Sequence, residues 1–219
     1  MDFSWTTIVI VILLIIIVYF VWTMLSSSTT VSSVTQLATT PSTLTVADAN
    51  SFSFSVWIYV NNWTTTSGSN NKPIISTTAG SDFDLSLGNS NNSLSVKVGS
   101  DTLSVPNIPL QTWALIIANV NNGNSLDIYV NGKLVQTTAL QSTYSLKGGS
   151  VTVGGSDSFD GYIYATFKDS PLGPQDAWDI YSNGYGSSGA GSSVSDFFNK
   201  YKVRFAFVKD NVELSSLDI

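Results

Sequence analysis

An uninterrupted apolar run near the N-terminus is the strongest hydropathy signal in the chain. Residues 8–25 read IVIVILLIIIVYFVWTML, 18 residues without a charge, and an indole stands near each end of the run. At about 1.5 Å per residue, the step between the two indoles covers roughly 26 Å, close to the ~30 Å hydrocarbon core of a bilayer. The pattern predicts a single transmembrane helix within residues 1–25. Its expected membrane contacts are Trp5, Ile8, Leu14, Tyr19 and Trp22.

A cleaved signal peptide is the alternative interpretation of this run. Residues 1–4 contain no Lys or Arg, the run is long for a signal sequence, and no small-residue cleavage site follows it. These features favour an uncleaved anchor. The orientation of the helix in the membrane stays open. No Lys or Arg occurs before Lys72, so the positive-inside rule cannot be applied.

A segment rich in hydroxyl side chains follows the apolar run. Residues 26–43 contain 12 Ser or Thr in 18 positions. Such a segment buries too little apolar surface to offset the entropy of ordering it, so it predicts a stalk. Part of the segment is also compatible with an edge strand, since Thr and Val suit a pleated backbone.

From about Leu44 the apolar residues recur with a period of two. In residues 52–60, FSFSVWIYV, the apolar residues occupy one face, and Ser53, Ser55, Trp57 and Tyr59 occupy the other. Further short runs separated by Gly- and Asn-rich turns are 73–77, 83–87, 94–98, 102–105, 112–120, 126–130, 133–138, 151–154 and 162–167. Many short strands with no sustained helical period beyond the N-terminal run predict an all-β sandwich.

Two local motifs sharpen this prediction. The runs 126–130 and 133–138 flank Asn131-Gly132, the pair that tolerates positive φ at both centres of a type I′ turn, so a hairpin is expected there. After the run 162–167, Pro174 suits the first turn of a short helix through Tyr181, with Trp178 packing inward.

Composition narrows the chemistry. The chain has a net charge of -6 and contains no Cys and no His, which removes thiolate, imidazole and disulfide chemistry. Serine nucleophiles would lack a histidine base, and the acidic balance argues against a nucleic-acid partner. The sequence therefore predicts a non-enzyme with no catalytic residues.

Three segments in order resemble the concanavalin A-like, laminin-G-like jelly rolls. They are residues 52–59 (FSFSVWIY), 113–136 (a strand opened by Trp, a polar loop and the Asn-Gly hairpin) and 151–181 (a Gly-Gly turn, Phe-x-Gly-x-Ile, an outgoing strand and a short helix). The resemblance implies a two-sheet antiparallel sandwich over residues 44–183.

The same resemblance bears on activity and metal binding. The glucanase branch of the superfamily uses two Glu around an Asp, whereas the only Glu here is Glu213, outside the matched region. Asp82 and Asp84 on one strand face are better interpreted as a solvated edge. Some laminin-G domains bind calcium through oxygen ligands at a loop rim, which makes Asp82, Asp157 and Asp160 candidate ligands. No other cofactor is expected.

The C-terminal region departs from the family pattern. Residues 184–195 predict a flexible Gly/Ser linker. In residues 196–219, which we call the C-terminal arm, positions 197–209 carry four positive charges and no negative one, and apolar residues alternate with polar ones. The arm either adds a strand to the sandwich or pairs with another subunit. The expected partner contacts are Lys200, Lys202, Arg204, Phe205 and Phe207.

The whole arrangement resembles the membrane-anchored laminin-G-like proteins of large nucleocytoplasmic DNA viruses. This resemblance implies a single-pass minor virion protein that links an internal membrane to a protein shell, with the bilayer and capsid proteins as partners. The alternative is a surface lectin or adhesin that recognises glycans through Trp63 and Tyr185. A degenerate glycosidase comes third.

Overall fold

A computed structural model describes residues 32–63, 71–77, 82–185, 204–209 and 212–218. The expected anchor, with its contacts from Trp5 to Trp22, lies outside these ranges, as do Lys200 and Lys202 of the C-terminal arm. Within the described ranges, no helix is long and apolar enough to cross a membrane. The anchor therefore stays a prediction.

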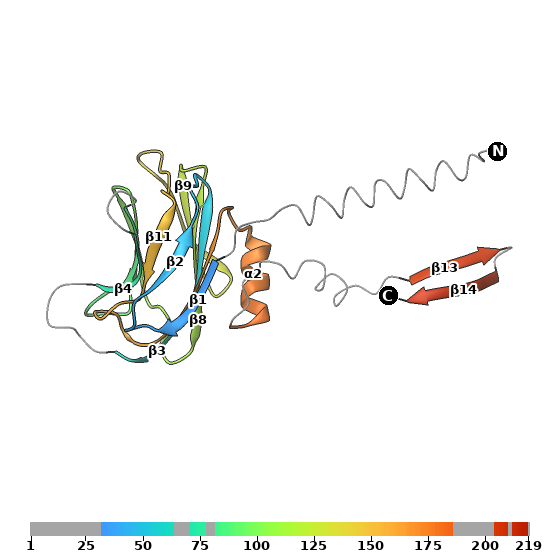
Figure 1. Ribbon diagram of the computed structural model, residues 1–219, viewed down its shortest axis with the longest axis horizontal. Helices are drawn as coiled ribbons and strands as arrows, with labels where there is room; N and C mark the ends of the chain where they lie inside the picture. Colours follow the sequence, from blue (N-terminus) through green and yellow to red (C-terminus); the bar gives the residue numbers. More distant parts are fainter. Residues whose placement is uncertain (1–31, 64–70, 78–81, 186–203, 210–211, 219) are drawn as a thin grey trace. The chain divides into compact units, whose positions relative to one another are not determined.

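Twelve strands form two antiparallel sheets of six strands each, which face one another as the layers of a sandwich (Figure 1). Sheet A has the order β1 (Ser32–Leu37), β12 (Asp160–Lys168), β3 (Phe52–Asn62), β8 (Trp113–Asn121), β9 (Ser125–Val130) and β10 (Lys133–Ala139). Sheet B has the order β2 (Ser42–Val46), β11 (Gly149–Val153), β4 (Lys72–Thr77), β5 (Phe83–Leu87), β6 (Leu94–Val98) and β7 (Asp101–Val105). The all-β sandwich predicted from the alternation is confirmed.

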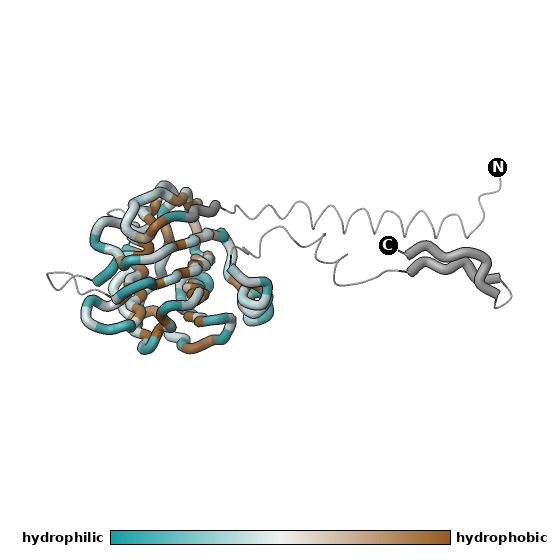
Figure 2. Tube along the Cα trace, turned by 90° about the horizontal axis from the view of Figure 1, so that it is seen from below, coloured by the Kyte–Doolittle hydropathy of each residue, from teal (hydrophilic) through white to brown (hydrophobic). Residues whose placement is uncertain are grey.

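The core lies between the sheets and follows from the alternation. Apolar and polar positions alternate along the strands, as the brown and teal stretches of Figure 2 show. Phe54 of β3 stacks on Phe83 of β5 with ring centroids 4.8 Å apart, and Phe167 of β12 lies 5.2 Å from Phe54. All three side chains are fully buried. Aromatic packing across the interior thus joins sheet A to sheet B.

The first two strands correct the predicted stalk. β1 and β2 fall within residues 26–43 or directly after them, and each is an edge strand, β1 beside β12 and β2 beside β11. Ser, Thr and Val side chains are compatible with an edge strand, whose outer face and free edge meet water. The edge-strand alternative is therefore right for residues 32–37 and 42–46, and the sandwich begins earlier than expected.

The Asn-Gly hairpin is confirmed. Asn131 and Gly132 have φ values of 50° and 75° and join β9 to β10. A β-bulge interrupts the pairing between Leu134 and Gln136. A Cβ at Gly132 would lie 3.0 Å from the Tyr181 side chain, so glycine also lets this turn approach the neighbouring helix.

The helix α2 (Pro174–Asn183) follows β12 and lies outside sheet A (Figure 1). Pro174 occupies its first turn, and the Asp176 carboxylate accepts a hydrogen bond from the Gly173 N–H at 2.9 Å. The helix is confirmed, but the inward placement of Trp178 is wrong. Ala177 and Ile180 take the buried side of the helix, which leaves Trp178 45% exposed.

The described part of the C-terminal arm forms a hairpin of its own. β13 (Arg204–Lys209) pairs antiparallel with β14 (Val212–Asp218), with Phe205 opposite Leu217. Among the described residues, neither strand is hydrogen-bonded into sheet A or sheet B. Of positions 197–209, residues 204–209 form a strand, which pairs with β14, whereas residues 197–203 lie outside the described ranges.

Candidate functional site

The outer face of sheet A carries a second apolar cluster, separate from the core between the sheets. α2 and the segment before it cover the central strands through Leu172, Ala177 and Ile180. The sheet residues that they bury are Trp57, Leu115, Ile117 and Tyr129. The outward side of β3 is therefore buried at Trp57, where α2 crosses the strand.

A buried asparagine fixes the connection into α2. The Asn119 side chain on β8 is 2% exposed. Its Nδ2 donates to the Leu172 carbonyl oxygen at 2.9 Å, and its Oδ1 accepts from the Leu172 N–H at 2.9 Å. Because the amide satisfies both backbone groups of Leu172 in a buried place, it holds the chain to the sheet just before the helix begins.

Beyond the reach of α2, one cross-strand row of sheet A is apolar and partly open to solvent. Leu37 of β1 is paired with Tyr162 of β12, Tyr162 with Tyr59 of β3, and Tyr59 with Trp113 of β8. We call these four residues the aromatic row. Leu37 is 50% exposed and Tyr162 is 44% exposed. The rings of Tyr59 and Trp113 are 5.5 Å apart, and those of Trp113 and Tyr162 are 6.4 Å apart.

Tyr185 extends this row at the end of α2. Its ring stacks on Trp113 with centroids 3.8 Å apart and meets the edge of Tyr164 at 5.8 Å. The other side of Tyr185 stays open, since the residue is 44% exposed. With Trp178 of α2, these residues give an outward surface of Trp and Tyr rings. We call the aromatic row together with Tyr185 and Trp178 the aromatic face.

The exposed apolar residues are unevenly distributed over the described residues. Within the described parts of residues 36–185, the large hydrophobic residues that are exposed belong to sheet A or to α2 and its C-terminal end: Leu37, Leu134, Val135, Tyr162, Trp178 and Tyr185. Apart from Pro73 of β4, which lies opposite Ser86, the outward positions of sheet B include only polar or charged residues, among them Thr43, Thr45, Asp84, Ser86, Ser95, Lys97, Thr102 and Ser104. Clustered exposed apolar side chains mark interaction surfaces, and here they lie on one side of the sandwich.

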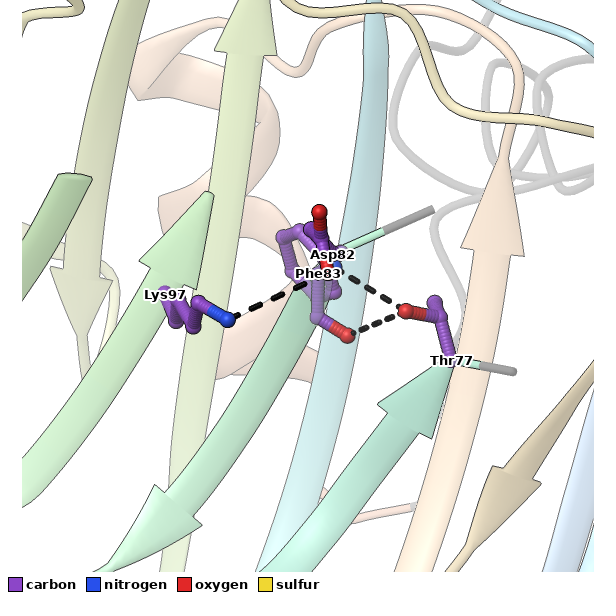
Figure 3. Close-up of polar contacts among 4 residues, drawn as sticks. All are labelled: Thr77, Asp82, Phe83 and Lys97. Atoms are coloured by element: carbon purple, nitrogen blue, oxygen red, sulfur yellow. Dashed lines mark hydrogen bonds and ion pairs between the residues drawn. The ribbon is translucent and has the colours of Figure 1, made fainter. Parts of the chain in front are cut away.

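The expected solvated edge at Asp82 and Asp84 lies at β5 of sheet B, with Asp84 in the strand and Asp82 directly before it. Figure 3 shows the contacts around Asp82. Asp82 precedes β5 with a φ of 42°, and its carboxylate lies 3.9 Å from the Lys97 Nζ, with both side chains exposed. Nearby, the Thr77 hydroxyl donates to the Phe83 carbonyl oxygen and accepts from the Phe83 N–H, at 2.9 and 3.0 Å. Burial raises the pKa of Asp84, while Lys97 opposes that rise. The exposed ion pair between Asp82 and Lys97 contributes little to stability.

The three calcium candidates do not come together. Asp82 lies at the end of the sandwich where β4 passes into β5. At the opposite end, Asp157 lies before β12 and Asp160 is the first residue of that strand. The Asp160 carboxylate accepts hydrogen bonds from Asn61 Nδ2 at 3.2 Å and Asn62 Nδ2 at 3.1 Å. In the ranges that the structure describes, no group of three or more acidic, His or Cys side chains is placed to hold a metal ion.

The two candidate glycan contacts have different surroundings. Trp63 is half-buried against the core, and the Lys72 Nζ lies 5.5 Å from the centroid of its ring. Lys72 is fully buried, and neither its Nζ nor the Trp63 Nε1 has a hydrogen-bond partner in the described part of the chain. Burial lowers the pKa of Lys72. Of the two predicted contacts, Tyr185 is the one with an open ring.

The aromatic row was not among the sequence-based candidates, although one signal for it was present. Alternation places Tyr59 on the outward face of β3, beside Trp57. Trp113 is the first residue of β8, and Tyr162 opens the predicted run 162–167. Antiparallel pairing of both strands with β3 sets their side chains beside Tyr59. The fourth member, Leu37, lies in residues assigned to the stalk.

Several solved structures of toxin domains have a similar fold. The receptor binding domain of botulinum neurotoxin D aligns with a TM-score of 0.53 at 16% identity, over 69% of this chain and 44% of that chain. The serotype D ligand binding domain in complex with N-acetylneuraminic acid gives 0.54 at 16% identity, over 69% and 42%. The serotype G binding domain gives 0.51 at 14% identity, over 72% and 47%. This chain spans less than half of each, and the likeness concerns the fold.

A sequence comparison identifies the family of the chain. No curated protein sequence matches the chain. A family model described as the concanavalin A-like lectin/glucanases superfamily matches residues 32–168. These bounds run from the first residue of β1 to the last residue of β12, and so include every strand of both sheets. The chain belongs to the concanavalin A-like lectin/glucanases superfamily.

Proposed function

We propose that this chain is a non-catalytic binding module, held at a membrane by residues 8–25, that links the membrane to a protein shell as a minor virion component. The observation that carries the proposal is the hairpin β13–β14, whose strands pair with one another and with no other strand among the described residues. An isolated two-stranded hairpin is marginally stable in water. A hairpin of this kind is suited to ordering against another chain.

The sequence of the C-terminal arm supports a protein partner. Phe205 and Phe207 alternate along β13, so they belong to one face of the strand, and Phe205 is opposite Leu217. Lys200, Lys202 and Arg204 add positive charge to the same stretch. We infer a partner that offers an apolar groove or strand edge beside acidic side chains. A capsid protein of the shell fits this role.

The carboxylates of the sandwich support a non-catalytic module. A retaining glycosidase needs two carboxyl groups about 5 Å apart on either side of the scissile bond. Asp82 is exposed beside Lys97, and Asp84 faces outward on sheet B. The botulinum neurotoxin structures with a similar fold are described as binding domains. Binding, rather than hydrolysis, is the function that we carry over from them.

Site-specific photo-crosslinking tests this proposal. A benzophenone amino acid replaces Phe205 in the full chain within its native assembly, and a matched variant carries it at Thr102 on the outer face of sheet B. We expect Phe205 to give a covalent adduct with a different chain and Thr102 to give none. Equal adducts at the two positions, or none at Phe205, would contradict a partner-binding arm.

Glycan binding is a second candidate, favoured by the half-open rings of Tyr162 and Tyr185. Aromatic faces of this kind suit the apolar faces of sugar rings, and one neurotoxin domain of similar fold is described in complex with N-acetylneuraminic acid. Selective signals on a glycan array that Tyr185→Ala removes and Thr102→Ala retains would support this function. A blank array would favour the structural one.

A further inference from the structure

We propose that the aromatic face of sheet A lies on the bilayer to which the chain is anchored. This inference rests on the anchor of the proposed function and adds an orientation: sheet A toward the lipid, sheet B away from it. The occupant of the aromatic face is the headgroup region of the membrane, not a soluble ligand.

The chemistry of the aromatic face fits the membrane–water interface. Apart from Leu37, its members are all Trp or Tyr: Tyr59, Trp113, Tyr162, Trp178 and Tyr185. These two residue types combine an apolar ring with one polar atom and are enriched where a protein crosses the headgroup region. The outward positions of sheet B, by contrast, are Ser, Thr, Asp and Lys together with Pro73, and none of them is aromatic. The two faces of the sandwich therefore differ in the way that a surface lying on a membrane and one facing water should differ.

The connection to the anchor brings this face within reach of the lipid. The expected transmembrane helix ends at Leu25 and β1 begins at Ser32, so six residues, 26–31, separate them. The seven residue steps from Leu25 to Ser32 span at most about 25 Å when fully extended. β1 is the edge strand of sheet A, and it contributes Leu37 to the aromatic row only about 17 Å further along the strand. The first strand after the expected anchor thus belongs to sheet A.

Because the anchor tethers the sandwich to the membrane, a modest affinity of the aromatic face for lipid is enough to orient the sandwich. Each exposed member of the face has about half its surface open, so no single residue inserts deeply. A short connection turns association with the membrane into an intramolecular step, with an effective concentration of about millimolar or more. Weak partitioning of several rings then fixes the orientation of the sandwich on the bilayer.

The net charge of the sandwich predicts which lipids it prefers. Residues 32–185 contain ten Asp and five Lys, with no Glu or Arg, so their net charge is 5 − 10 = −5. Two of these carboxylates, Asp176 and Asp179, lie on α2 beside the aromatic face. Anionic lipid repels such a surface over roughly a Debye length of ~8 Å. Neutral headgroups are therefore the preferred lipids.

Single-cysteine labelling in nanodiscs tests the proposal, and the absence of cysteine from the chain makes each introduced thiol unique. Full chains carrying Tyr162→Cys or Leu134→Cys on the sheet A side, or Thr102→Cys on sheet B, receive an environment-sensitive fluorophore. The nanodiscs contain phosphatidylcholine with a headgroup-level quencher. We expect at least threefold stronger quenching at positions 162 and 134 than at 102, and a smaller difference when phosphatidylserine replaces part of the phosphatidylcholine.

The outcomes separate this inference from the proposed function. Equal quenching at the three positions in chains that have entered the nanodisc overturns the orientation and leaves the anchor standing. Chains that do not enter the nanodisc refute the anchor, and the orientation fails with it. Labels at 162 and 134 that stay open to water in nanodiscs but become protected in the native assembly overturn the lipid contact and assign the aromatic face to a protein.

Discussion

Replacing Lys72 by methionine should stabilise the sandwich. Lys72 is fully buried at the start of β4, and its Nζ has no hydrogen-bond partner in the described residues. A buried donor left unpaired costs about 1–3 kcal/mol. The contact of the amine with the Trp63 ring, at 5.5 Å from the centroid, offsets about 0.5–2 kcal/mol of that cost. Methionine keeps the length of the side chain and removes the unpaired donor.

The net expectation for Lys72→Met is a gain of about 1 kcal/mol in the free energy of unfolding at pH 7. For a domain of this size, that gain corresponds to a rise of about 2–4 °C in Tm. Urea unfolding followed by circular dichroism measures the change. Lys97→Met is the matched control, because Lys97 is exposed beside Asp82 and its loss should change stability by less than about 0.5 kcal/mol.

The same variant should alter the pH dependence of stability. Burial lowers the pKa of Lys72 below its usual value of 10.5. Just below pH 10.5 the unfolded chain therefore binds more protons at this side chain than the folded chain does, so the free energy of unfolding rises with pH across that interval. The variant lacks this rise, and its advantage should shrink as the pH approaches 10.5. A Lys72→Met protein less stable than the parent by 1 kcal/mol or more, or an advantage independent of pH, would refute the reasoning.

Three further outcomes follow from the described contacts. Gly161→Ala should cost at least about 2 kcal/mol, since a Cβ there would overlap the Tyr59 carbonyl oxygen; a thermal melt within 2 °C of the parent would contradict this. Asn119→Ala should cost about 2–4 kcal/mol and speed amide exchange in α2, because both backbone groups of buried Leu172 lose their partner; unchanged exchange would contradict it. A panel of β-glucans should show no turnover by the full chain, and activity that Asp82→Asn abolishes would disprove a non-catalytic module.

The sequence predicts the interior strands well for a physical reason. β5 and β6 appear over 83–87 and 94–98, as the alternation predicts, because each has one face in the core and the other in water. β1 and β2 lack this contrast. Their Ser- and Thr-rich composition is shared with an unstructured stalk, and only pairing with β12 and β11 distinguishes the two. Pairing between distant segments is not a property of local composition.

The candidate site depends on tertiary packing that the sequence does not record. Trp57 and Tyr59 have the same outward position on β3, yet α2 buries Trp57 to 3% exposure and leaves the row at Tyr59 uncovered. Trp178 is outward for a related reason, since the helix turns its smaller Ala177 toward the sheet. Which aromatic side chains stay exposed is decided by where the helix crosses, and alternation alone cannot locate that crossing.

Retention of the shell protein on membranes tests the bridging role most directly. Membranes that carry the full chain are compared with membranes that carry a chain truncated after Ser195, which removes the C-terminal arm and retains the anchor and the sandwich. After alkaline carbonate treatment, both chains should stay in the membrane pellet. When shell protein is added to untreated membranes, only those with the full chain should hold it, with at least a tenfold difference. Equal retention on the two kinds of membrane would contradict a module that joins membrane to shell through its arm.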